Sequence, residues 1–240
     1  MCTDPRLSPP PASPERRRLL RDGTVAAGLL ALGALPGTMG AQSLHVAPTP
    51  ATPAEALAAL QEGNRRFAAG QTLAPHRDIA RVRAIAPKQT PFAAFLGCAD
   101  SRVPVEIVFD QGFGDLFVSR IAGNIAVSEQ IASLEFGTAV LGAKVLYVLG
   151  HTACGAVAAT MAGTEVPGQI SSLYYHIRPA VRAANGNIDV AIRENVRNQA
   201  LLLREGSTVI NRLVREKQLL VAGGVYDLTS GVVTPVELEA

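Results

Sequence analysis

Cys98-Ala99-Asp100-Ser101-Arg102 directly follows the apolar run 92–97, and His151-Thr152-Ala153-Cys154-Gly155 directly follows the largely apolar run 144–150. A short apolar run of this kind is typical of a buried strand. Open α/β sheets place their functional sites at the carboxyl ends of such strands. The two runs therefore predict a sheet in which both polar clusters lie at the same edge.

The two clusters together supply two thiols, from Cys98 and Cys154, and one imidazole, from His151. Zinc takes sulfur and nitrogen ligands tetrahedrally, and a catalytic zinc site has three protein ligands and one open position. No fourth cysteine lies near either motif, so we expect one catalytic zinc ion per chain. A disulfide between Cys98 and Cys154 is the alternative that the spacing leaves open.

Asp100 and Arg102 lie two residues apart in the first cluster, where they are expected to form a bidentate ion pair. Such a pair would keep Asp100 ionised and would direct one of its oxygens toward zinc-bound hydroxide. Two alternatives remain, namely that Asp100 itself binds zinc and closes the site, or that the pair is an ordinary solvated salt bridge.

Further strands are expected at residues 116–120 and 219–226, each separated from its neighbours by helical segments. Strands that alternate with helices predict a parallel sheet. The turn before Val232-Val233 predicts one antiparallel strand at the edge of that sheet. The fold class is therefore α/β, with a mainly parallel sheet flanked by helices and an N-terminal helical arm.

That helical arm begins at Thr52-Pro53-Ala54-Glu55, which has the pattern of a capping box with proline at the first helical position. The arm is expected to end at Gly70. The other expected helices are 76–85, a helix capped by Ser128, a helix beginning near Cys154-Gly155, and the polar stretch 168–217, with breaks at Pro179 and at 185–186.

Residues 1–42 have the organisation of a secretory signal. The basic segment Arg16-Arg17-Arg18-Leu19-Leu20-Arg21 precedes an apolar run over 25–35 and a zone of small residues. The arginine pattern resembles a twin-arginine signal, which predicts export to the periplasm. Residues 43–51 are then a linker, and residues 52–240 form the domain that carries both clusters. An uncleaved amphipathic anchor is the alternative.

The 240 residues are 48% hydrophobic and carry a formal net charge of +2. This length and composition suit one domain with a substantial core. Because no block of like charges occurs in the body of the chain, neither nucleic acid nor an anionic membrane is indicated as a partner.

The pattern Cys-x-Asp-x-Arg followed by His-x-x-Cys-Gly is similar to that of the β-class carbonic anhydrases. The similarity covers nearly all of residues 52–236. It extends through Glu62-Gly63-Asn64-Arg65-Arg66-Phe67, Gly114-Asp115-Leu116-Phe117-Val118-Ser119-Arg120, Ala122-Gly123-Asn124, Ser133-Leu134-Glu135-Phe136 and Val225-Tyr226-Asp227-Leu228. The resemblance implies reversible hydration of carbon dioxide to bicarbonate and a proton, by attack of zinc-bound hydroxide.

The same resemblance assigns roles to individual residues. It implies that Cys98, His151 and Cys154 are the zinc ligands and that Asp100 and Arg102 are the catalytic pair. It further implies that the substrate pocket includes Gln89, Phe117, Phe136 and Gly155. The resemblance also implies a homodimer, or an assembly of such dimers, in which the N-terminal helix lies across the neighbouring subunit and pocket residues cross the interface.

Two other functions remain compatible with these residues. One is hydrolysis of carbonyl sulfide or carbon disulfide, which are also linear molecules with an electrophilic carbon. The other is a zinc- or bicarbonate-binding domain without catalysis. Some family members have a regulatory bicarbonate pocket that includes a tryptophan; this chain has no tryptophan, and Phe95 stands at the matching position. The resemblance thus favours the open, unregulated form.

Overall fold

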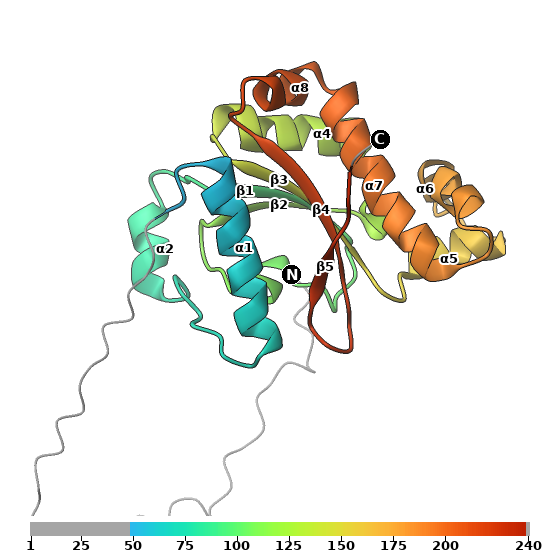
Figure 1. Ribbon diagram of the computed structural model, residues 1–240, viewed down its shortest axis with the longest axis horizontal. Helices are drawn as coiled ribbons and strands as arrows, with labels where there is room; N and C mark the ends of the chain where they lie inside the picture. Colours follow the sequence, from blue (N-terminus) through green and yellow to red (C-terminus); the bar gives the residue numbers. More distant parts are fainter. Residues whose placement is uncertain (1–48, 239–240) are drawn as a thin grey trace, which may run out of the picture. The chain divides into compact units, whose positions relative to one another are not determined.

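The computed structural model describes residues 49–238, which form a five-stranded sheet with helices on both faces (Figure 1). The strand order is β2-β1-β3-β4-β5; the first four strands are parallel, and β5 is antiparallel to β4. The strands are β1 (Ala93–Gly97), β2 (Leu116–Arg120), β3 (Val145–His151), β4 (Leu220–Tyr226) and β5 (Val233–Pro235). The predicted α/β fold class is confirmed, including the antiparallel edge.

Residues 1–48 and 239–240 are outside the described residues. The expected signal peptide, 1–42, and most of the expected linker, 43–51, therefore remain predictions.

Strands β1 and β3 are buried along their whole length, as their continuous apolar sequences predicted. They are adjacent and parallel, and Gly97 at the end of β1 lies opposite Leu149 near the end of β3. The chain consequently leaves both strands at the same edge of the sheet. This register brings the Cys98 stretch close to the His151 stretch.

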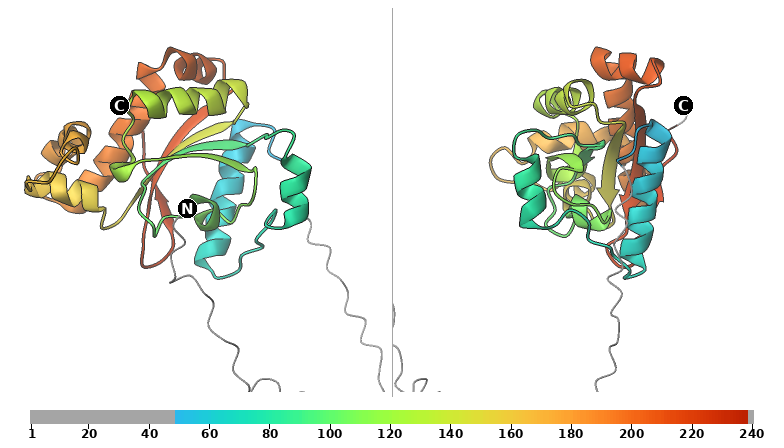
Figure 2. Two further views of the ribbon diagram at one scale, coloured as in Figure 1. Left: turned by 180° about the vertical axis from the view of Figure 1, so that it is seen from behind. Right: turned by 90° about the vertical axis from the view of Figure 1, so that its left-hand side faces the viewer.

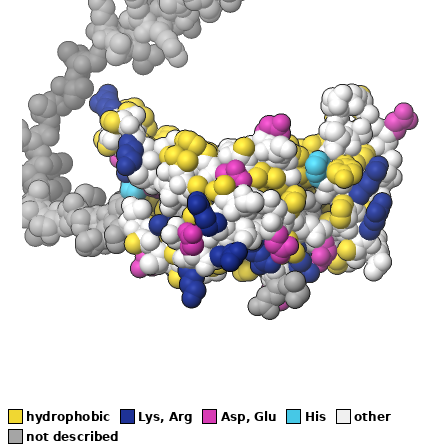
Figure 3. Space-filling view, turned by 90° about the horizontal axis from the view of Figure 1, so that it is seen from above, with side chains coloured by type: hydrophobic (Ala, Val, Ile, Leu, Met, Phe, Trp, Pro, Cys, Tyr) yellow, Lys and Arg dark blue, Asp and Glu magenta, His cyan; other side chains and the backbone are white. Residues whose placement is uncertain are grey.

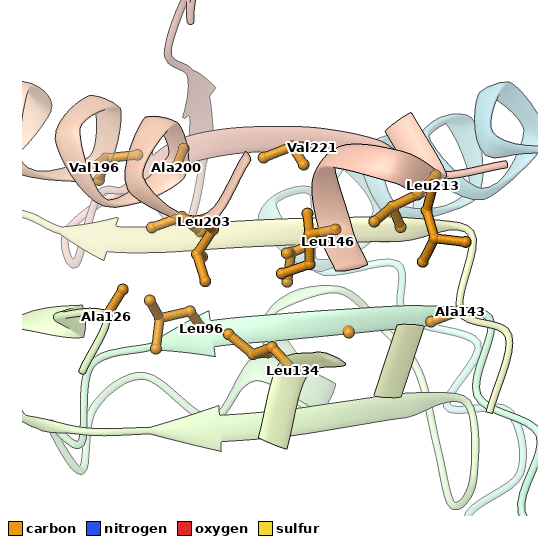
Figure 4. Close-up of a cluster of buried hydrophobic side chains, with 14 of the residues drawn as sticks. Leu96, Ala126, Leu134, Ala143, Leu146, Val196, Ala200, Leu203, Leu213 and Val221 are labelled. Carbon is orange, nitrogen blue, oxygen red and sulfur yellow. The ribbon is translucent and has the colours of Figure 1, made fainter. Parts of the chain in front are cut away.

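Alternate residues of each strand pack against different helices. Ala93 and Phe95 face one core, shared with α1 and α3, while Ala94 and Leu96 face the other, shared with α4, α7 and α8. Figure 2 shows α1 and α4 on opposite sides of the sheet, and Figure 4 shows the second core between the sheet, α4 and α7. Phe95 is fully buried in the first core, where its ring packs against those of Phe109 and Tyr147.

Helix α1 (Pro53–Ala68) begins with the predicted capping box, in which Thr52 accepts from the Glu55 N–H and Glu55 accepts from the Thr52 N–H. Its buried Asn64 donates to the carbonyls of Val108 and Gly231 and accepts from the Val233 N–H. The helix is thereby tied to the core of its own chain. Its predicted contact with a neighbouring subunit would have to use the opposite, exposed face.

The remaining helices are α2 (Ile79–Ile85), α3 (Val105–Val108), the 3-10 turn η3 (Ala122–Asn124), α4 (Ser128–Glu135), the π-helical turn η4 (Phe136–Val140), α5 (Gly155–Ala162), α6 (Ser172–Ala183), α7 (Ile188–Gly206) and α8 (Thr208–Arg215). The break expected at residues 185–186 is present between α6 and α7.

Two details of the helix prediction were wrong. Helix α6 continues through Pro179, because the buried residues Ile177 and Ala180 on either side of the proline anchor the helix and outweigh one missing N–H bond. Ser128 does not cap α4; Val127 has the extended conformation of the N-cap residue, so Ser128 already lies in the first helical turn.

None of the helices within residues 49–238 is long and apolar enough to cross a membrane. On the face shown in Figure 3, Lys and Arg side chains are interspersed with Asp and Glu side chains and with small hydrophobic areas.

Candidate metal centre

Three buried side chains converge at the carboxyl edge of the sheet. Cys98 follows β1, His151 is the last residue of β3, and Cys154 is the N-cap residue of α5. One ligand atom from each residue lies within 4.8 Å of the ligand atoms of the other two. The structure thus brings together the three residues that the sequence predicted as zinc ligands.

The imidazole of His151 is oriented as a metal ligand requires. Its Nδ1 lies 2.9 Å from the carbonyl oxygen of Thr152. Because a carbonyl only accepts, Nδ1 carries a proton, and in the neutral imidazole Nε2 then retains its lone pair. Nε2 is buried and has no hydrogen-bond partner among the described residues. A buried acceptor without a partner is costly, and a metal ion at this position would satisfy it.

Both cysteines are free thiols, so the disulfide alternative finds no support in the structure. A hydrogen bond from Cys154 lowers the pKa of Cys98 to about 4; burial opposes this shift, and His151 adds to it. The same interaction, together with burial, raises the pKa of Cys154.

Asp100 and Arg102 form the expected bidentate ion pair. Nε of Arg102 lies 2.9 Å from Oδ1 of Asp100, and Nη2 lies 2.7 Å from Oδ2. These hydrogen bonds keep the pKa of Asp100 far below its usual range, although partial burial opposes the shift. Asp100 is thus an oriented carboxylate at neutral pH.

The loop that carries Asp100 is held in place from β2. Arg120, the last residue of that strand, donates from Nε to the carbonyl of Cys98 and from Nη2 to the carbonyl of Asp100. Two carbonyls of the loop are therefore fixed by one guanidinium group. Nothing in the sequence indicated this role, because Arg120 reads as the charged end of an edge strand.

The structure does not bring all the predicted pocket residues to the cluster within one chain. Gly155 is adjacent, as the first residue of α5. Gln89 is exposed and lies before the amino end of β1, whereas Cys98 follows its carboxyl end. Phe117 lies opposite Ala94 of β1. Ala94 is four residues before Cys98, which corresponds to about 13 Å along an extended strand. Phe136 packs beside Phe117, with 6.3 Å between the ring centroids.

Sequence reasoning missed two buried amides near the centre, those of Asn195 and Gln199 on α7. Asn195 donates to the carbonyl of Gly123, whose own N–H donates to the sulfur of Cys98. Both amides lie in a polar helical stretch, where such residues ordinarily face solvent. No local pattern in the sequence distinguishes them from exposed polar residues of a helix.

The donor set suits zinc. Two thiols and one imidazole on a buried edge match the ligands that zinc prefers, and three protein ligands leave one position open. Oδ2 of Asp100 lies 3.8 Å from Nε2 of His151. Its bidentate pairing with Arg102 fixes its direction independently of a metal.

Comparison with known proteins gives a consistent result. The model of the carbonic anhydrase family matches residues 93–233. Carbonic anhydrase 2 of Mycobacterium tuberculosis is 36% identical over 187 residues, which are 75% of this chain and 90% of that protein. The carbonic anhydrase of Mycolicibacterium smegmatis is also 36% identical, over 75% of this chain and 91% of that protein.

Solved structures show the same similarity. The β-carbonic anhydrase CafA of Aspergillus fumigatus has a TM-score of 0.61 and 26% identity, and covers 66% of this chain and 81% of its own. The Coccomyxa β-carbonic anhydrase, solved in complex with acetazolamide, has a TM-score of 0.60 and 26% identity, and covers 75% of this chain and 86% of its own.

Proposed function

The chain belongs to the β-carbonic anhydrase family and is an enzyme of that kind, and on this premise we propose that it hydrates carbon dioxide reversibly with one zinc ion held by Cys98, His151 and Cys154. The observation that carries the proposal is the buried, partnerless Nε2 of His151, which faces two thiols beside the Asp100–Arg102 pair.

Zinc bound by these ligands would supply Lewis acidity, which generates a nucleophile from water at neutral pH. The residues of the chain then have separate tasks. Asp100, ionised and held by Arg102, accepts a hydrogen bond from the attacking oxygen and orients it. His151 keeps its Nε2 directed at the cluster through the Nδ1–H bond to Thr152.

We also propose that a second copy of the chain completes the substrate pocket. Gln89 lies at the amino end of β1, whereas the metal cluster lies at the carboxyl end. Phe117 belongs to the edge strand β2. Phe136 packs beside Phe117 and is 46% exposed. These residues are therefore placed to contact a neighbouring subunit, where they would provide a polar amide and apolar walls for a linear, uncharged substrate.

Export by a twin-arginine route remains part of the proposal. It rests on the sequence of residues 16–42, with its basic segment, apolar run and small-residue zone. Fractionation of the producing cells tests it: the protein is expected in the periplasm without its first residues, and a full-length cytoplasmic protein would contradict it.

The decisive experiment for the activity is stopped-flow hydration of carbon dioxide by the purified protein, between about pH 6.5 and 9, the range in which zinc-bound water ionises. We expect hydration throughout that range. Activity only at high pH would indicate that Asp100 closes the metal site at lower pH. A protein with zinc bound and no hydration at any pH would overturn the proposal; turnover of carbonyl sulfide or carbon disulfide would then identify the alternative substrate.

A further inference from the structure

The sulfur of Cys98 accepts a hydrogen bond from the backbone N–H of Gly123, with a distance of 3.3 Å. Gly123 is the middle residue of the turn η3 and has a φ of +76°, a conformation that favours glycine. A Cβ atom at this position would lie 2.7 Å from Cδ1 of Ile177 and 3.2 Å from Cβ of Ala156. A side chain at position 123 would therefore be strained by the positive φ and would push against Ile177 and Ala156.

The other side of Gly123 is fixed by a side chain from a distant part of the sequence. Nδ2 of Asn195, on α7, donates to the Gly123 carbonyl at 2.9 Å. Asn195 is 1% exposed, so water does not compete for this bond. Because φ and ψ of a glycine are otherwise soft, this bond to the Gly123 carbonyl restrains the turn and limits how far the Gly123 N–H can move away from the sulfur.

Asn195 is itself held in one orientation. Oδ1 of Asn195 accepts from Nε2 of Gln199, at 3.3 Å, and Oε1 of Gln199 accepts from the Ala126 N–H, at 2.8 Å. Since the backbone N–H of Ala126 can only donate, the two ends of the Gln199 amide are defined. That assignment in turn defines which atom of Asn195 faces Gly123.

Helix α7 lies at a fixed depth against the sheet. Val196, next to Asn195, packs over Gly150 and Gly223, where a Cβ would lie 2.5 and 2.7 Å from its methyl carbons. Figure 4 shows Val196 and Ala200 of α7 pointing toward the strands. The close contact at two glycines leaves α7 little freedom to move Asn195 relative to Gly123.

We propose that Asn195, oriented by Gln199, is a positioning residue for the metal centre: it holds Gly123 so that the Gly123 N–H stays directed at the Cys98 sulfur. This inference rests on the proposed function, because it assumes that Cys98 binds the metal. A hydrogen bond to a metal-bound thiolate withdraws charge from the sulfur and fixes its direction. Neither carbon dioxide nor the attacking oxygen needs to touch Asn195.

The inference predicts a change at the sulfur when the Asn195 donor is removed. With cobalt in place of zinc, the absorption band for charge transfer from thiolate to metal reports directly on the sulfur. In Asn195→Leu, which has a similar size and no donor, we expect this band to move to longer wavelength. We also expect zinc to bind roughly tenfold more weakly, because removing a group that supports a metal ligand through hydrogen bonds typically lowers metal affinity by at least this factor.

Asn64→Leu is the matched control. Asn64 is also a buried amide that bridges backbone groups of separate elements, at Val108, Gly231 and Val233, and it is tied to α1 rather than to the cluster. We expect this variant to lose stability while its cobalt spectrum and zinc affinity match those of the wild type. An equal spectral change in both variants would show a general loosening of the fold and would overturn the inference.

A second variant and a second measurement guard against misfolding of Asn195→Leu. Asn195→Ala also removes the donor and places no bulkier apolar group against the turn; it should show the same spectral shift. In the wild type loaded with NMR-active cadmium, the Gly123 amide proton should show scalar coupling to the metal through the sulfur. Absence of that coupling, or folded variants with unchanged spectrum and affinity, would overturn the inference. A wild type that binds no cobalt, zinc or cadmium would instead overturn the metal centre itself.

Discussion

Oδ2 of Asp100 lies 3.8 Å from Nε2 of His151 while it accepts a hydrogen bond of 2.7 Å from Arg102. The carboxylate is thus beside the buried cluster and is held there by a residue on its own loop. Because Arg102 occupies both of its oxygens in a bidentate pair, the direction of the carboxylate is fixed before any substrate arrives.

The first prediction concerns the charge of Asp100. Asp100→Asn should retain zinc and slow carbon dioxide hydration about a hundredfold, since a neutral amide cannot hold Arg102 in the same way and presents an N–H where an acceptor is needed. Stopped-flow hydration and zinc content on the same sample provide the measurement. A variant with normal zinc and undiminished activity would exclude an orienting role for Asp100.

The second prediction tests whether the pocket is shared between two chains. Gln89→Ala and Asp100→Asn should each be strongly impaired as homodimers. When the two variants are co-expressed, a mixed dimer would carry one site with both substitutions and one intact site. Random pairing then restores about one quarter of the wild-type activity. Two different affinity tags allow the mixed dimers to be isolated. If these dimers recover no hydration activity, then either Gln89 and Asp100 of one chain serve the same site, or Gln89 lies outside the site.

The third prediction concerns Cys154 as a ligand. Cys154→Ser should lose zinc and, with it, stability, because metal binding contributes to the free energy of folding. Metal analysis and thermal unfolding, with and without a chelator, measure both effects. Chelation should destabilise the wild type and leave the variant unchanged. Zinc that remains tightly bound to the variant would remove Cys154 from the ligand set.

The fourth prediction concerns Asp110, whose side chain is fully buried and accepts from Arg66 at 2.7 Å and from the N–H groups of Leu73 and Ala74 at 2.9 Å. Burial raises the pKa of this carboxyl, and these hydrogen bonds outweigh it, so that the net pKa is lowered. The unfolded carboxyl therefore binds a proton at higher pH than the folded one. The resulting stability is complete above the unfolded pKa of about 3.9 and is lost as the pH falls through the folded value.

Asp110→Asn should consequently lower the free energy of unfolding by about 2 kcal/mol at neutral pH, since charged hydrogen bonds are lost. The difference from the wild type should shrink as the pH falls below about 4. Urea unfolding at a series of pH values measures both quantities. A difference that stays constant down to pH 3 would show that ionisation of Asp110 does not contribute.

The fold and the three cluster residues were predictable because their signals are local. Strands β1 and β3 are continuous apolar runs, and Cys98 and His151 stand where those runs end. The capping box at Thr52 is likewise contained within four residues. In each case neighbours along the chain determine the structure.

The contacts missed from the sequence join residues that are far apart in it. Asn195 and Gly123 are separated by 72 residues, and Asp110 and Arg66 by 44. Such pairs form only when tertiary packing brings two elements together, so local pattern does not reveal them. The wrong break at Pro179 has the same origin, because burial of Ile177 and Ala180 overrides the local preference of proline.

The most direct test of the central claim is removal and return of the metal. The protein as purified should contain about one zinc ion per chain, lose carbon dioxide hydration when a chelator removes it, and regain activity in proportion to the zinc restored. Hydration that persists in protein stripped of metal, or protein that takes up no zinc at Cys98, His151 and Cys154, would contradict the account.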